Sequence, residues 1–224
     1  MQREAPDSLF YREIRDFNLE FLGLLAAARE AGHGAAFGLA RPTIESIARL
    51  SAAQLEAMAM TPCMLASLAR ERGLRVTRLA EPPVAADPRW MEDSRVFAAR
   101  LLTYAWQVAR RDSLHAVLCV GPAADVISPD MSYGELRALA RGDLRRVEAR
   151  FHEHPRFWPD LVRAARDGHA EEMRLAQLAA IPLATTDVGP PRPPRQSCDS
   201  TRTVALARDR LPCTMTRHAG ARRS

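Results

Sequence analysis

The fold of this chain is decided by residues 8–28, which read SLFYREIRDFNLEFLGLLAAA. Apolar side chains recur there every three or four residues, the spacing that lines one face of an α-helix. The stripe comprises Phe10, Ile14, Phe17, Phe21, Leu24, Leu25 and Ala28. Such a face needs an apolar partner surface, so we expect it to form an interface with a second copy of the chain or with another part of the same chain.

Short helices follow this first helix closely. Gly32-His33-Gly34 ends it, and residues 42–50 have the pattern of a short helix. The next helix begins at Ser51-Ala52-Ala53-Gln54 and runs to Met60. These four residues form a capping box, in which the Ser and Gln side chains bond backbone N–H groups at the helix start.

A weaker copy of this arrangement follows later in the chain. When residues 21–59 are laid on 102–140 without a gap, seven positions are identical, and helix starts and apolar turns coincide. The coincident features are the capping boxes Ser51/Gln54 and Ser132/Glu135, and the turns 35–39 and 116–120. We interpret the chain as two related helical units. The alternative interpretation is an ordinary helical domain, whose second half has helices of similar length to those of the first half but is not related to it.

The sequence predicts an all-α fold in four parts. Residues 1–80 form the first helical unit, and the proline-rich segment 81–92 forms a linker, because proline disrupts both helices and strands. Residues 93–186 form the second unit. For residues 187–224 we expect a disordered basic arm or sequence without a selected function, because periodic apolar residues are few.

Further elements are expected inside both units. Helices are predicted over approximately 62–72, 143–152, 158–167 and 169–180, and the alternation over 74–79 indicates a short strand. Beyond Pro182 we expect no further ordered element.

The net charge of +5 is carried by the predicted tail. From Asp187 onward eight arginines face three aspartates, whereas residues 1–186 contain 24 arginines and 24 carboxylates. Phosphate neutralisation supplies most of the non-specific affinity of a protein for DNA. A neutral body therefore argues against strong DNA binding without a partner.

Two clusters of arginines are the candidates for contact with DNA phosphates. They are Arg70, Arg72, Arg75 and Arg78 around a glycine turn, and Arg137, Arg141, Arg145, Arg146 and Arg150 at four-residue spacing. A stripe of this kind can follow phosphates along one helix face. Carboxylates lie among these arginines, so a solvated face of ion pairs is the alternative interpretation.

The sequence contains no known catalytic motif, and we expect that the protein is not an enzyme. There is no Gly-x-Ser-x-Gly turn and no phosphate-binding glycine loop. His152 and His154 stand at i and i+2 and cannot face one metal ion from a regular helix, so neither they nor His169 predict a metal site. We expect no catalytic residue, metal or cofactor.

Cys63 and Cys119 stand among apolar residues. We expect both to be buried thiols, since a free cysteine packs as a small apolar residue. The N-terminus is polar and no segment approaches the length of a membrane span, so we expect a cytoplasmic protein without contact to a membrane.

A series of short motifs follows along the first unit. Residues 13–22, EIRDFNLEFL, place an acidic or polar residue and Asn-Leu ahead of an aromatic position. The series continues with Ala36-Phe37-Gly38-Leu39, Ile47-Ala48-Arg49-Leu50-Ser51, Gln54-Leu55 and Met58-Ala59. From the start of the chain to Ala59 it resembles the FlhD family of bacterial flagellar transcriptional regulators.

The resemblance implies a helical subunit of a transcriptional regulator, an activator at promoters of flagellar or related secretion genes. In that family the partner subunit, FlhC, carries a four-cysteine zinc site and much of the DNA contact. We therefore expect a FlhC-like partner or self-association, with promoter DNA bound only in the complex. Family members are about half this length and often carry an intersubunit cysteine, but Cys63 comes too early for that position, so no disulfide is expected.

A duplicated unit would change the assembly that the resemblance implies. A module that buries its helical face against a second copy could here find that copy in the same chain. The chain would then be a fused dimer with pseudo-twofold symmetry. The main alternative is an all-α interaction or assembly protein that makes no contact with nucleic acid.

Overall fold

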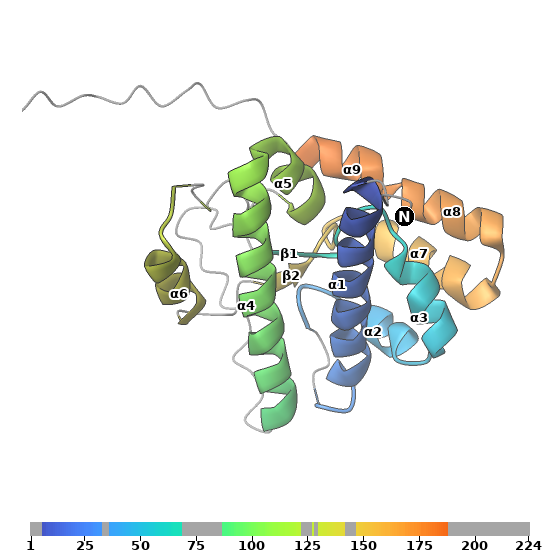
Figure 1. Ribbon diagram of the computed structural model, residues 1–224. Coiled ribbons are helices and arrows are strands. Elements are labelled where there is room, and N and C mark those ends of the chain that lie inside the picture. Colours follow the sequence, from blue (N-terminus) through green and yellow to red (C-terminus); the bar gives the residue numbers. More distant parts are fainter. Residues whose placement is uncertain are drawn as a thin grey trace, which may run out of the picture. The chain divides into compact units, whose positions relative to one another are not determined.

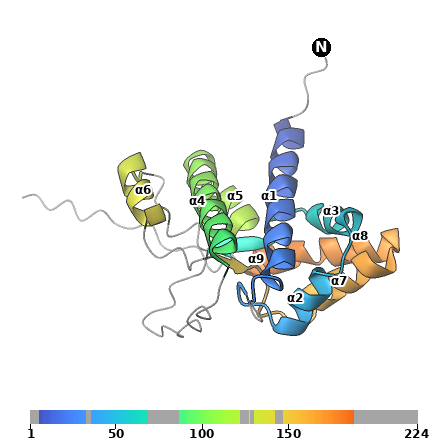
Figure 2. The ribbon, with the colours of Figure 1, turned by 90° about the horizontal axis from the view of Figure 1, so that it is seen from below.

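Helix α1 (Pro6–Ala28) is the long first helix that the apolar stripe predicts. The stripe faces the interior: Ile14, Phe21, Leu24 and Leu25 are buried, and Phe10 and Phe17 are half-buried. Figures 1 and 2 show α4 (Pro88–Arg111) alongside α1, and α2 (Arg41–Ile47) and α3 (Ala52–Ala59) also pack against it. The stripe is therefore covered from within the chain.

The computed structural model describes residues 6–32, 36–68, 87–121, 127, 130–141 and 147–187 (Figure 1). The expected strand over 74–79 lies outside these residues, as do residues 81–86 of the expected linker and residues 188–224 of the expected tail.

The remaining elements complete a mostly helical fold, as the sequence predicts. They are β1 (Ala66–Leu68), α5 (Ser113–Val120), α6 (Tyr133–Arg141), β2 (Val147–Ala149), α7 (Phe157–Asp167), α8 (Ala170–Leu178) and α9 (Ala180–Asp187). Helix α7 packs on α2 and α3, α8 on α3 and α7, and α9 on α5 and α8. Helix α6 packs on α4.

Phe21 lies where the two predicted units meet. Its ring stacks on Phe97 of α4, with centroids 5.6 Å apart and an interplanar angle of 23°. The edge of Trp158, on α7, approaches the same ring at 6.5 Å. All three side chains belong to one continuous apolar core, so the two units share their interior instead of enclosing separate ones.

Two of the predicted helices are wrong. Residues 66–68 of the helix expected over 62–72 form strand β1, and residues 147–149 of the helix expected over 143–152 form strand β2. The helix expected over 158–167 is confirmed as α7, and that over 169–180 as α8.

Both ends of the second helical unit also differ from expectation. Helix α4 begins at Pro88, inside the expected linker, because proline is favourable at the first helical position and the Asp87 carboxylate accepts a hydrogen bond from Arg89 N at 2.9 Å. Helix α9 runs past Pro182 to Asp187, where we expected no ordered element.

Asn18 explains why the chain is not helical after α3. The side chain is 1% exposed, and its amide nitrogen donates to the carbonyls of Ala59, Thr61 and Cys63 at 3.2, 3.3 and 3.0 Å. Its amide oxygen accepts from Leu65 N at 2.7 Å. A helix would use these backbone groups internally, so the buried amide of α1 replaces helical hydrogen bonds where α3 ends and fixes the irregular segment 60–65.

The irregular segment 60–65 leads into the strand pair. Strands β1 and β2 are antiparallel, with Ala66 opposite Ala149, Ser67 opposite Glu148 and Leu68 opposite Val147. Carbonyls outside the sheet bond N–H groups in β2 and just before β1: Phe37 O, in a turn, accepts from Ala149 N at 2.7 Å, and Cys119 O, in α5, accepts from Met64 N at 3.0 Å. The Ala149 N–H group would otherwise be unpaired at the edge of a two-stranded sheet.

Two pairs of elements are separated by the offset of the expected repeat, but the apolar turn expected over 116–120 is wrong, because these residues belong to helix α5 whereas 36–39 form a turn. Strand β1 starts at Ala66 and β2 at Val147, and α3 starts at Ala52 and α6 at Tyr133, so both pairs keep the same separation along the chain. Both predicted capping boxes are confirmed: Ser51 and Gln54 exchange hydrogen bonds, and so do Ser132 and Glu135. The bonds that Glu135 accepts from the backbone and hydroxyl of Ser132 hold the pKa of its carboxyl below the usual value.

We predict that the Asn18 amide cannot be replaced without a large loss of stability. In Asn18→Leu four backbone groups lose their partner, and in Asn18→Asp a carboxylate faces three carbonyl oxygens. Each change should lower the free energy of unfolding by about 3 kcal/mol, measured by urea denaturation followed by circular dichroism. The control Asp16→Asn alters an exposed residue of the same helix and should change it by less than about 0.5 kcal/mol. Equal effects of Asn18→Leu and Asp16→Asn would contradict the role of the amide.

Gly38 lies against β2 and should also be intolerant to substitution. Its φ is +85°, and a Cβ atom would lie 2.9 Å from Cδ2 of His152, whose Nδ1 is 2.8 Å from Ala149 O. Gly32 has a similar φ of +81° but open space around it. In the same denaturation assay, Gly32→Ala should cost about 1 kcal/mol from backbone strain, and Gly38→Ala about 3 kcal/mol from strain and overlap. Equal losses would show that the contact with His152 is unimportant.

Candidate functional site

The predicted DNA-contacting arginines fall into three groups in the structure. Arg70, Arg72, Arg75, Arg78, Arg145 and Arg146 lie outside the described residues. Arg141 ends α6 and is described only by its backbone, whereas Arg137 is exposed on the same helix. Arg150 is buried. Arg137 is thus the one residue of the prediction whose described side chain is accessible to a phosphate.

The prediction that Arg150 contacts DNA is wrong. Its side chain is 2% exposed, and its guanidinium donates to the carbonyls of Val117, Leu118 and Cys119 at 3.3, 2.9 and 3.0 Å. These carbonyls end α5, where a helix has free acceptors and a partial negative charge. Arg150 therefore caps a helix from inside the protein.

The backbone of Arg150 connects further elements. Its N–H donates to Leu65 O at 2.7 Å, next to β1, and its carbonyl accepts from the indole N–H of Trp158 at 2.8 Å. The guanidinium also lies 4.9 Å from the centroid of the Phe151 ring. The four-residue spacing of the arginines predicted that Arg150 is exposed, but this prediction assumed a helix. The residues directly before Arg150 form strand β2 instead.

Helices α2 and α3, joined by residues 48–51, are the described pair most similar in length and spacing to a helix-turn-helix. A reading helix needs exposed polar side chains in its first turns. In α3 the exposed residues are Ala52, Ala53 and Glu56. Gln54 is engaged by the capping box, and its amide also donates to Arg166 O at 3.3 Å. Because a carboxylate repels phosphate, α3 is unsuited to reading DNA.

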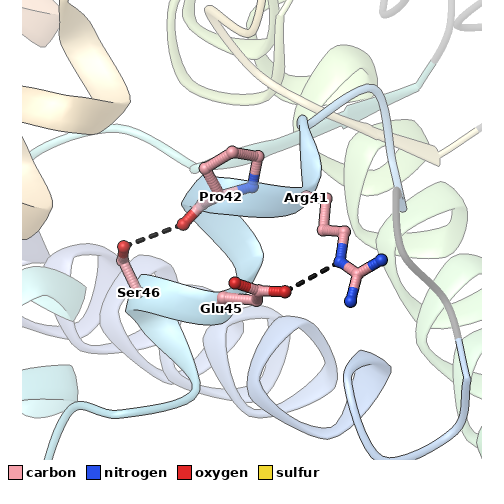
Figure 3. Close-up of polar contacts among 4 residues, drawn as sticks. All are labelled: Arg41, Pro42, Glu45 and Ser46. Carbon is pink, nitrogen blue, oxygen red and sulfur yellow. Dashed lines mark hydrogen bonds and ion pairs between the residues drawn. The ribbon is translucent and has the colours of Figure 1, made fainter.

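The arginine that begins α2 is engaged with a carboxylate. Figure 3 shows Arg41 Nε bonded to Glu45 Oε1 at 2.8 Å, and Ser46 Oγ donating to Pro42 O at 2.8 Å. The bond from Arg41 holds the pKa of the Glu45 carboxyl below its usual value, and the charges of Arg49 and Arg29 add to this effect. The positive charge of this surface is therefore partly neutralised.

Similar ion pairs occur on other helices. They are Arg95–Glu92, Arg100–Glu20, Arg156–Asp160, Arg163–Asp160 and Arg166–Asp167. Over the described residues 17 arginines stand against 20 aspartates and glutamates. The arginine excess of the chain therefore lies in the segments outside them, and the described surface has the mixed character of a solvated face.

Apolar side chains are exposed on the last two helices. Leu175 is 67% exposed, Leu178 44% and Ile181 46%, and the three recur at three-residue intervals across α8 and α9. Exposed large apolar residues that cluster in this way often mark protein interaction sites. This α8–α9 stripe is the described surface whose chemistry best suits a protein partner.

Two histidines and both cysteines of the described residues have structural contacts, whereas His169 is exposed. Nδ1 of His154 accepts from Phe157 N at 3.1 Å, at the start of α7. Within the described ranges no group of three His, Cys, Asp or Glu side chains could hold a metal ion. Cys63 and Cys119 are buried free thiols, as predicted. Burial raises the pKa of Cys119 to about 12, and the neighbouring Cys63 contributes to the shift.

No helix among the described residues is long and apolar enough to cross a membrane. Comparison with known proteins gives no match: no family model, no curated protein and no solved structure is similar to this chain. The resemblance to FlhD therefore rests on the motifs of the first unit.

We predict that Arg150 contributes to stability through the number of its donors as well as through its charge. Arg150→Met removes the guanidinium bonds to three carbonyls of α5, of which Val117 O and Cys119 O keep a backbone N–H donor, and should lower the free energy of unfolding by about 3 kcal/mol. Arg150→Lys keeps the charge but cannot reach all three carbonyls, so its loss should be intermediate.

The matched control is Arg137→Met on exposed α6, which should change stability by less than about 0.5 kcal/mol in the same urea titration. If Arg150→Met and Arg137→Met were equally stable, the buried guanidinium would not be the cap of α5.

Proposed function

We propose that this protein is a single-chain regulatory subunit of the FlhD type, with two helical units in place of two subunits. It acts in the cytoplasm through a partner protein at promoters of flagellar or related secretion genes, and it contacts DNA only within that complex. The pairing of β1 with β2 is the observation that carries the proposal.

The register of this pair supports a pseudo-twofold relation. A twofold axis through two antiparallel strands places a central residue opposite its own counterpart and exchanges the neighbours on either side. At the offset that lays 21–59 on 102–140, Ser67 corresponds to Glu148, and the two are opposite each other. Ala66 is opposite Ala149, the counterpart of Leu68. An accidental similarity of helix lengths would not require this register.

Backbone hydrogen bonds also join the two units in both directions. Phe37, in a turn of the first unit, accepts a hydrogen bond from Ala149 in the strand of the second unit. Cys119, in α5 of the second unit, accepts one from Met64, beside the strand of the first unit. The two bonds are similar but do not join residues that correspond at the same offset. The long helices α1 and α4 have 23 and 24 residues and pack against each other. Each unit thus contributes similar parts to the contact between them.

Charge supports the need for a partner in DNA binding. The described residues contain more carboxylates than arginines, α3 presents no side chain suited to bases, and Arg150 is buried. Non-specific affinity for DNA requires basic groups that neutralise phosphates. The α8–α9 stripe is an apolar surface through which a protein partner could be held.

The same charge balance favours a second candidate function. An all-helical interaction or assembly protein without nucleic-acid contact would also have paired surface arginines and an exposed apolar stripe. The two candidates differ in one property, which is salt-dependent affinity for DNA in the presence of a partner.

We predict DNA binding by the full chain only together with the product of the neighbouring gene, measured by fluorescence anisotropy on labelled promoter DNA across a salt series. Affinity should fall steeply as salt rises. Arg137→Glu, on exposed α6, should reduce the slope of log affinity against log salt by about one unit, whereas Arg174→Glu on α8 should leave it unchanged. No binding by either mixture at low salt would favour the interaction protein.

A fused dimer needs no second copy to cover the α1 stripe, so we predict a monomer of 24.8 kDa by light scattering at micromolar concentration. Leu175→Glu serves as a control for association through the α8–α9 stripe. A dimer that persists in Leu175→Glu would contradict the fused-dimer proposal, because it would use a different surface of the helical units.

A further inference from the structure

We draw no further inference here: the strongest candidate, the exposed apolar patch of Leu175, Leu178 and Ile181 on α8 and α9, is a helix face for which nothing in the described part of the chain shows what covers it.

Discussion

The structure depends on one buried amide. Asn18 stands in the middle of the apolar face of α1, and its four hydrogen bonds fix the backbone from the end of α3 to Leu65. A buried polar side chain is stable only when its groups are paired, and here every partner is a backbone group that a helix would otherwise use. The segment then leads into β1, which pairs with β2, so this side chain supports the contact between the two helical units.

Arg150 has the corresponding role on the other side of the strand pair. Burying a guanidinium is costly unless several acceptors replace its water, and the last carbonyls of α5 supply three of them. The same residue bonds Leu65 through its backbone N–H and Trp158 through its carbonyl. Asn18 and Arg150 thus fix the segments next to the two strands, each by binding backbone groups that are distant in sequence.

These contacts also bear on function. A buried arginine cannot contribute to a DNA-binding surface, and several exposed arginines, among them Arg41, Arg95 and Arg163, pair with carboxylates. The interior of the described body joins the two units into one core, while its surface offers an apolar stripe and little net positive charge. Such a surface supplies few of the basic groups that neutralise DNA phosphates, which is why the proposed function includes a partner.

The sequence by itself determined the elements whose signals are local. The stripe of α1, the capping boxes at Ser51 and Ser132, and helices α7 and α8 follow from apolar periodicity and cap chemistry within a few residues. The tertiary structure alone decided the strands, the burial of Arg150 and the role of Asn18. A strand as short as β1 has too brief a pattern to distinguish it from a helix, and the strand that it pairs with belongs to the other helical unit. Whether an arginine is exposed to solvent or caps a helix likewise depends on the position of carbonyl groups that are distant in sequence. A local sequence pattern contains no information about that position.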